Sequence, residues 1–324
     1  MKFPDAVRLI ADDLERVEAL VRANFQSDAP MVPIIGDYIF SGGGKRFRPI
    51  LVLLSSRLCG YRGDRSITHA CVVEFLHTAT LLHDDVVDGA EKRRGLLSAN
   101  AKYGNEMSVL VGDFLLARSV LMTTRDGSLK LLELLSDTVA LMSEGEILQL
   151  VNVRNPALSE DEYLKVIHRK TAALIAASCM IGSVLADAGE EKEQALWRFG
   201  EKVGMAFQLI DDVLDFTADE SRLGKAVGTD LREGNATLPV ILLLQQASRS
   251  ERHELGEMLG AAHVGSEQIE HVLALMRRYG TLDSTVERAR AFIQDAHREL
   301  RCFEPSPYLD ALKAVADYVV TRGQ

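Results

Sequence analysis

The sequence predicts an all-α protein, and three observations support that prediction. Leucine, alanine and glutamate are common among its 324 residues, whereas aromatic residues make up only 6% and prolines number 8, a composition that favours helices. Apolar residues recur with the spacing of one helix face along most of the chain, and no alternating strand pattern of convincing length occurs. Because no proline- and serine-rich linker divides it, we expect residues 1–324 to form one large helical bundle with a deep central cavity.

The first helix is expected over residues 5–25, where apolar residues at i, i+3, i+4 and i+7 leave one face for water. A glycine-rich loop, SGGGKRFRP, ends at Pro49, which suits the first turn of a helix. A basic loop is expected at 90–95 and a polar loop at 221–239. The remaining helices are expected at 31–41, 50–59, 65–88, 105–125, 129–152, 160–187, 191–217, 240–248, 251–260, 266–279, 281–303 and 306–321.

Charge and cysteine content exclude some functions. The net charge of −10 makes nucleic acid an unlikely partner. The four cysteines form no CxxC pair, so we expect reduced thiols in a cytoplasmic protein. We expect no signal peptide before the first helix. The weakly charged stretch 171–186 is shorter than the ~20 apolar residues of a membrane span.

The stretch FLHTATLLHDDVVDG places three acids at the end of an apolar helix. Helical spacing puts Asp84 and Asp88 on one face with Asp85 beside them, and Gly89 suits the helix C-terminus. The helix dipole is negative there, so each carboxylate costs about 0.3–1 kcal/mol. A hard divalent cation, above all Mg²⁺, would offset this repulsion.

Asp211, Asp212 and Asp215 repeat the same DDxxD spacing after a second apolar run. A single DDxxD is a weak signal, because a solvated helix end explains it equally well. Two copies can face each other across the cavity of a helical bundle. Six carboxylates around one cavity require metal ions, which would also bind phosphate oxygens.

Cations accompany the acids. Lys45, Arg46 and Arg48 follow three glycines and precede a helix, where backbone N–H groups favour an anion. An arginine follows the lysine, which excludes a Walker loop, and a solvated basic turn is the alternative. Arg93 and Arg94 follow the first acidic cluster closely and suit bidentate phosphate contacts.

Several polar residues lie within apolar helices. His77 precedes Asp84 by two helical turns and is expected on the same face, although a core histidine is the alternative. Lys170, Thr171 and Gln208 are costly to bury unless paired. A further polar patch consists of Glu144, Glu146 and Gln149. These residues can either belong to the core or support the residues of the site.

Together these residues predict two diphosphate sites, one bound through metal and one through cations, above a long apolar pocket. Metal ions stabilise the charge on a diphosphate leaving group as its C–O bond breaks. The organic remainder becomes a carbocation, which the alkene of a second molecule attacks.

The motifs GGGKRFRP, EFLHTATLLHDDVVDGAEKRRG, HRKT and FQLIDDVLDF, the last followed by GKAVGTD, resemble those of the trans-isoprenyl diphosphate synthases. The resemblance covers the chain from about residue 30 onward and is closest to the long-chain bacterial members. It implies condensation of isopentenyl diphosphate with an allylic diphosphate such as farnesyl diphosphate. It also implies a product of octaprenyl length for quinone side chains and a homodimer. Transient membrane contact for product release is a further hypothesis.

The resemblance also implies residue roles. About two or three Mg²⁺ ions and the allylic diphosphate would be bound by Asp84, Asp85, Asp88, Asp211, Asp212 and Asp215. The allylic diphosphate would further contact Arg93, Lys170 and Lys225. Isopentenyl diphosphate would be held by Lys45, Arg48, His77 and Arg94, with Thr171 and Gln208 near the carbocation. The family usually has a lysine where this chain has Asn235, which puts one phosphate contact in doubt.

Product length is expected to depend on the helix that carries the first acidic cluster. Short-chain family members place aromatic residues about one turn before that cluster and block the tunnel. Ala79 and Thr80 leave it open here, and Leu76 would line it, so a long product is expected. The floor is expected deeper, at Met122, Leu132 or Leu135.

Three other functions each fit part of the sequence. A class I terpene cyclase also ionises a diphosphate with Mg²⁺, but it needs no second anion site. An HD-type phosphohydrolase would use the His83–Asp84 pair and leave the second DDxxD unexplained. A regulatory subunit of a heteromeric synthase would be expected to lose aspartates that this chain retains.

Overall fold

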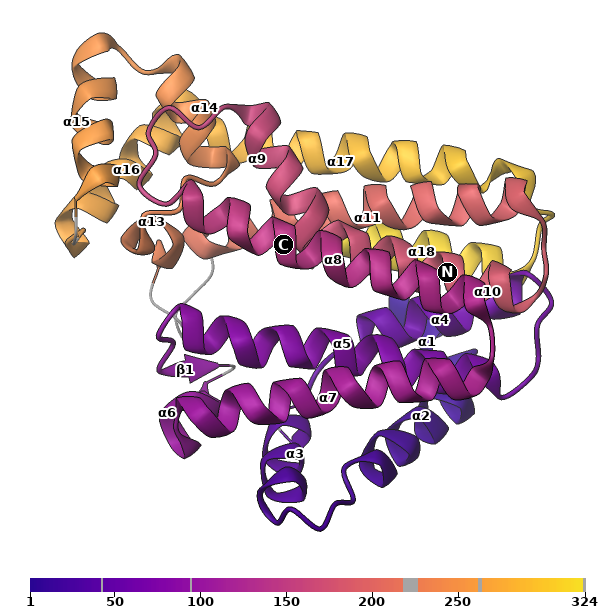
Figure 1. Ribbon diagram of the computed structural model, residues 1–324. Helices are drawn as coiled ribbons and strands as arrows, with labels where there is room; N and C mark the ends of the chain where they lie inside the picture. The colour runs from indigo at the N-terminus through magenta and orange to yellow at the C-terminus, as the bar shows by residue number, and fades with distance from the viewer. Residues whose placement is uncertain (42, 94, 218–226, 262–263, 323–324) are drawn as a thin grey trace. The chain divides into compact units, whose positions relative to one another are not determined.

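A computed structural model describes residues 1–41, 43–93, 95–217, 227–261 and 264–322 (Figure 1). The all-α class is confirmed, because the strands within these residues are limited to a short antiparallel hairpin of β1 (Lys92–Arg93) and β2 (Leu96–Leu97). The α-helices are α1 (Phe3–Arg8), α2 (Ala11–Asn24), α3 (Met31–Ser41), α4 (Phe47–Leu58), α5 (Arg65–Val87), α6 (Ala99–Tyr103), α7 (Asn105–Asp126), α8 (Leu129–Val151), α9 (Glu160–Ile167), α10 (Ala173–Leu185), α11 (Glu190–Thr217), α13 (Thr229–Glu233), α14 (Leu238–Gln246), α15 (Arg249–Gly260), α16 (Ser266–Tyr279), α17 (Thr281–Glu299) and α18 (Pro307–Thr321).

The chain divides into two compact units. Unit 1 comprises Met1–Val139, Leu174–Gly200 and Glu299–Val315. Unit 2 comprises Ala140–Ala173, Glu201–Arg298 and Ala316–Gln324. The first DDxxD therefore belongs to unit 1 and the second to unit 2. The expectation of a single domain stays a prediction.

Helix α5 is the central element of unit 1. It packs against α2, α4 and α7 (Figure 1), and buried residues occur on all its faces, from Ser66 to Asp85. A helix that is apolar on every side has to be enclosed by others. Close approach is also required between α10 and α4, because a Cβ on Gly182 would lie 2.3 Å from the backbone nitrogen of Ser56. Glycine alone permits that crossing.

Several expected elements differ in the structure. The helix expected at 5–25 is interrupted at Leu9 and Ile10, which leaves Leu9 exposed and turns Ile10 into the core. The expected basic loop at 90–95 contains strand β1 of the hairpin, and the helix expected at 160–187 contains a π-helical turn, η1 (His168–Ala172). The helix expected to reach residue 303 ends as a 3₁₀ turn, η2 (Leu300–Cys302). In the expected helices the apolar spacing continues through a change of backbone that it does not encode.

Within the described residues, α7 is the one helix long and apolar enough to cross a membrane. It packs along α5 in unit 1 and buries Val111 and Leu115 there. Packing on α5 therefore accounts for one apolar face of this helix.

Candidate active site

The first acidic cluster lies at the C-terminal end of α5. The helix ends at Val87, and Gly89 follows with φ of 62°, a left-handed conformation that suits glycine. The three acids have different environments: Asp85 is 2% exposed, Asp84 is half-buried and Asp88 is exposed. The side chains at the first and last positions of the motif are thus the more accessible ones.

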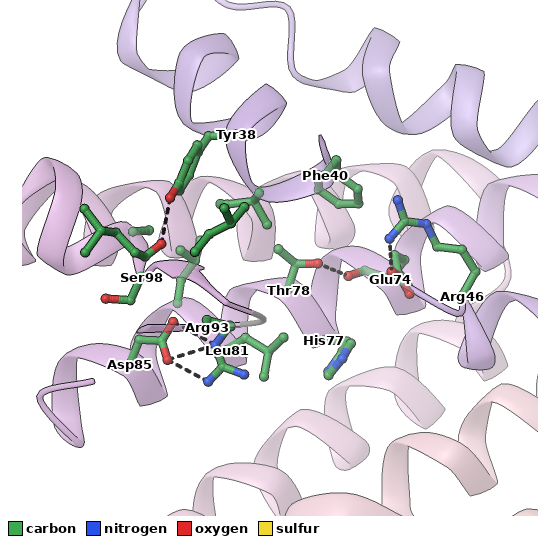
Figure 2. Close-up of a pocket in the computed structure, with 15 residues that line it drawn as sticks. Tyr38, Phe40, Arg46, Glu74, His77, Thr78, Leu81, Asp85, Arg93 and Ser98 are labelled. Carbon is green, nitrogen blue, oxygen red and sulfur yellow. Dashed lines mark hydrogen bonds and ion pairs between the residues drawn. The ribbon is translucent and has the colours of Figure 1, made fainter. Parts of the chain in front are cut away.

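Arg93 neutralises the buried carboxylate. Its Nε donates to both oxygens of Asp85, at 2.9 and 2.8 Å, and one terminal nitrogen donates to Oδ1 at 2.6 Å. The β1–β2 hairpin supplies this arginine, so the turn after α5 folds back over its own acidic end (Figure 2). A paired, hydrogen-bonded charge is the form in which a buried carboxylate is tolerated.

A pocket in unit 1 opens beside this ion pair (Figure 2). One wall is the face of α5 that carries His77, Leu81 and Asp85, which are spaced one helical turn apart. The opposite wall comes from the end of α3 and the hairpin, where the Tyr38 hydroxyl donates to the Leu97 carbonyl at 2.7 Å. The pocket therefore combines an apolar lining with a histidine and a fixed arginine.

The cations after the glycine loop have separate environments. Arg46 has φ of 48°, lies over the Phe40 ring and forms ion pairs with Glu18 and Glu74. It therefore anchors the start of α4 and faces the protein. Lys45 is exposed, and Arg48 is half-buried on the first turn of α4.

The second acidic cluster lies near the end of α11 in unit 2. Asp211 accepts a hydrogen bond of 2.7 Å from Arg322, which follows α18. Asp215 accepts hydrogen bonds from the backbone N–H groups of Thr229 and Asp230, both at 3.2 Å, and so caps α13. These two aspartates are half-buried.

Asp212 is 1% exposed, and donors reach both of its oxygens. The Gln208 amide donates to Oδ1 at 3.0 Å, and the Tyr163 hydroxyl donates to Oδ2. Burial raises the pKa of Asp212 to about 8, and the nearby Asp230 carboxylate adds to the increase. Burial also raises the pKa of Tyr163, so its hydroxyl keeps its proton.

The π-helical turn carries the HRKT motif and is held on both sides. The Lys170 ammonium pairs with Glu146 of α8 at 2.5 Å, and the Thr171 hydroxyl donates to the Gln208 carbonyl oxygen at 2.9 Å. His168 contacts Glu201 at 2.7 Å. Such turns often mark functional sites in helices.

Gly145 allows α8 to approach this turn. A Cβ at Gly145 would lie 2.5 Å from the backbone nitrogen of Lys170. The polar patch of Glu144, Glu146 and Gln149 therefore has two members in contact with the motif: Glu146 pairs with Lys170, and Glu144 pairs with Arg169 at 3.6 Å.

The structure joins some predicted residues and leaves others apart. It brings together His77, Asp85 and Arg93 in unit 1, and Thr171, Gln208 and Asp212 in unit 2. Arg94 and Lys225 lie outside the described residues. Among the residues that are described, no three acid, histidine or cysteine side chains already converge as a metal site. The six-carboxylate site stays a prediction.

The residues proposed to set product length lie on α5. Leu76 and Ala79 are buried, and the half-buried Thr80 donates to the His77 carbonyl at 2.8 Å. They do not line the pocket beside Arg93, so their role stays a prediction. Asn235 is half-buried, and its backbone N–H donates to the Asp230 carbonyl at 2.8 Å.

Sequence reasoning missed Tyr163, Arg322 and Glu74. Tyr163 occupies an apolar position of an amphipathic helix and reads as a core residue. Arg322 and Glu74 are far in sequence from the residues they pair with. No local pattern identifies them. The histidine of the HD pair contacts α7 through the Val109 carbonyl, at 3.2 Å, which disfavours the phosphohydrolase reading.

Comparison with known proteins identifies the family. Residues 30–276 match the family model for polyprenyl synthetase. The chain belongs to the polyprenyl synthetase family. It is therefore a prenyltransferase.

A curated relative of this prenyltransferase is the octaprenyl diphosphate synthase of Escherichia coli, 42% identical over 97% of each chain. A solved decaprenyl diphosphate synthase from Rhodobacter capsulatus is 40% identical, with a TM-score of 0.95 over 99% of each chain. A polyprenyl synthase from Caulobacter crescentus, solved with calcium and isoprenyl diphosphate, is 37% identical, with a TM-score of 0.96 over 100% of this chain and 98% of that one.

Proposed function

We propose that this prenyltransferase is a long-chain all-trans polyprenyl diphosphate synthase that makes octaprenyl diphosphate for quinone side chains. It would extend an allylic diphosphate such as farnesyl diphosphate with isopentenyl diphosphate. The observation that carries the proposal is the pair of DDxxD clusters at the ends of two largely buried helices, each with arginine beside it. The 42% identity to an octaprenyl diphosphate synthase supports the product length.

The donor set of this chain fits Mg²⁺. The six aspartates of the two motifs offer only oxygen ligands, which a hard cation prefers. Those at the first and last positions, Asp84, Asp88, Asp211 and Asp215, are the more accessible ones. When bound, Mg²⁺ would stabilise the negative charge on the leaving diphosphate. A synthase from Caulobacter crescentus binds calcium, another hard cation, together with isoprenyl diphosphate.

The chain's own residues supply the remaining steps. Arg93 is fixed on Asp85 at the pocket edge, where it would orient the allylic diphosphate together with Lys170 and Lys225. His77 lines the same pocket, whose apolar wall suits a five-carbon isopentenyl group. Lys45, Arg48 and Arg94 would complete that second anion site. The Thr171 hydroxyl and the Gln208 amide present dipoles that would stabilise a nearby carbocation.

Incubation with Mg²⁺, labelled isopentenyl diphosphate and farnesyl diphosphate tests the function. Mass spectrometry of the products should show octaprenyl diphosphate as the longest major species. A cyclic hydrocarbon would favour a terpene cyclase instead, release of free phosphate a phosphohydrolase, and absence of turnover a regulatory subunit. A dominant product shorter or longer than octaprenyl would correct the proposed length.

A homodimer is part of the proposal, and α7 supplies its support. Val109, Leu110, Val120 and Leu121 are between 36% and 59% exposed on this helix in unit 1. An apolar strip of this kind is typical of a surface that another protein covers, and a second copy of the chain fits best. Sedimentation should give a dimer for the native protein. Leu110→Asp with Val120→Asp should shift it to monomer, and an unchanged dimer would place the interface elsewhere.

Two smaller parts of the proposal have their own tests. Transient membrane contact would let the long product leave. In flotation assays, lipid vesicles should therefore carry more enzyme after turnover than before turnover. Asn235→Lys should restore the usual family residue and lower the KM for a diphosphate substrate. An unchanged KM for both substrates would remove the suggested phosphate contact.

A further inference from the structure

Tyr163 has a role that the reaction as described leaves unassigned. It is 4% exposed on α9, and its hydroxyl donates to Oδ2 of Asp212, which is 1% exposed on α11. Both residues belong to unit 2. A core position could be filled by phenylalanine, so the hydroxyl points to a role at the carboxylate that accepts its hydrogen bond.

The other oxygen of Asp212 has its own donor. The Gln208 amide nitrogen donates to Oδ1 at 3.0 Å, while the Gln208 carbonyl oxygen accepts from the Thr171 hydroxyl at 2.9 Å. Because the hydroxyl of Thr171 donates to one end of the amide, the other end must present its N–H to Asp212. Two donors on two oxygens leave the carboxylate with one orientation.

Asp212 differs in this respect from the other acids of its cluster. Asp211 pairs with Arg322 and Asp215 accepts backbone N–H groups, and both are half-buried. Asp212 depends on neutral side-chain donors from two different segments. A buried carboxylate that loses such a donor is destabilised and free to rotate.

Two hydroxyl groups also connect the cluster to the π-helical turn. Tyr163 lies just before that turn and Thr171 lies within it, and both reach α11. Movement of the turn relative to α11 would therefore reorient Asp212. In this arrangement the HRKT motif and the second DDxxD form one hydrogen-bonded assembly.

We propose that Tyr163 is a positioning residue that, together with Gln208, holds the Asp212 carboxylate in the orientation from which the second aspartate cluster binds divalent cation. The inference rests on the proposed function of that cluster. It assigns Tyr163 an effect on cation affinity that it exerts only through Asp212.

Electron paramagnetic resonance of Mn²⁺ tests this, with Mn²⁺ as the probe in the presence of farnesyl thiodiphosphate, an unreactive analogue. Tyr163→Phe should raise the Mn²⁺ dissociation constant about tenfold. It should raise the Mg²⁺ concentration needed for half-maximal elongation by a similar factor and leave the KM for isopentenyl diphosphate within twofold. Gln208→Leu, which removes the other donor, should also weaken Mn²⁺ binding.

Tyr279→Phe is the matched control. The Tyr279 hydroxyl also donates to a carboxylate, Oε2 of Glu251 at 2.7 Å, and Glu251 lies on α15, away from the cluster. The control should leave Mn²⁺ binding unchanged. A double-mutant cycle separates positioning from general destabilisation: in the Asp212→Asn background, Tyr163→Phe should have no further effect on Mn²⁺ affinity. Thermal unfolding in EDTA identifies any variant that does not fold.

The outcomes separate this inference from the function on which it rests. If the native protein neither binds Mn²⁺ with the analogue nor elongates, the proposed function fails. If the native protein does both, the inference is overturned by unchanged Mn²⁺ affinity in Tyr163→Phe, or by an equal effect of that change in the Asp212→Asn background. Should Tyr163→Phe not fold, unchanged Mn²⁺ affinity in Gln208→Leu overturns it.

Discussion

Substitution of Gly145 by alanine should damage both stability and elongation. The added Cβ would lie 2.5 Å from the backbone nitrogen of Lys170, 2.9 Å from its Cα and 3.0 Å from the carbonyl carbon of Arg169. All three are backbone atoms, so no side-chain rotation relieves the overlap. To restore an ordinary contact of 3.4 Å, α8 and the π-helical turn must separate by about 0.9 Å.

Two opposing energies decide the size of the effect on stability. Overpacking of this kind costs about 1–3 kcal/mol, whereas alanine is better than glycine in a helix by about 1 kcal/mol. Because the overlap is between backbones, we expect an overpacking cost at the upper end of this range. After the gain from alanine, the net loss in free energy of unfolding is about 2 kcal/mol. For a chain of 324 residues this lowers the melting temperature by about 3 °C.

The effect on catalysis should be larger. The same displacement moves Lys170 and Thr171, and it strains the Lys170–Glu146 pair and the Thr171–Gln208 hydrogen bond. Misplacement of reacting groups by about 1 Å can cost about 10²-fold in rate. We therefore expect kcat/KM for the allylic substrate to fall between about tenfold and a hundredfold, measured by steady-state incorporation of labelled isopentenyl diphosphate.

Gly256→Ala provides the matched control. Gly256 lies within helix α15 of the same unit, where a Cβ would meet only the Pro156 side chain at 3.7 Å. This variant should retain native elongation and gain up to about 1 kcal/mol of stability. The reasoning about Gly145 is refuted if Gly145→Ala behaves like this control.

Three further predictions concern the other parts of the site. Ala79→Tyr places an aromatic ring before the first DDxxD and should shorten the main product by several isoprene units, as mass spectrometry of the chain lengths would reveal; an unchanged product would exclude Ala79 from the tunnel wall. Arg93→Lys keeps the charge but loses the forked contact with Asp85, so the KM for the allylic diphosphate should rise about tenfold with a small effect on isopentenyl diphosphate, and equal effects on both would argue against the assignment. The pKa of Asp212 in the folded protein, about 8, lies above its ordinary value of 3.8. Without bound metal, ionising this carboxyl therefore lowers the free energy of unfolding, and the loss grows between those two pH values by at most about 1.4 kcal/mol per pH unit. In EDTA, the stability of Asp212→Asn relative to the native protein should therefore increase from pH 5 to pH 8 in urea unfolding, and a difference independent of pH would contradict the burial argument.

The helices themselves follow closely from the sequence. Residues 31–41 and 266–279 form the helices expected from their apolar spacing, with the same bounds. The end of α5 was also predictable, because Gly89 supplies the left-handed residue after the acidic cluster. These features depend on interactions among residues within a few turns of one another, and local spacing records such interactions.

The sequence alone also identified the candidate residues for the chemistry. Two DDxxD motifs, the cations after the glycine loop and the HRKT motif differ enough from an ordinary amphipathic pattern to be recognised. Their polarity in apolar helices is unfavourable without ligands, and that is a property of the chain itself.

Only the tertiary structure decided how those residues are supported. The π-helical turn leaves the apolar pattern of its helix intact, so spacing does not reveal it. Tyr163 reads as a core aromatic until its hydroxyl is seen on Asp212, and Arg93 reads as a loop cation until it pairs with Asp85. These contacts join residues whose separation in sequence carries no periodic signal, because they depend on which helices the packing of the core brings together.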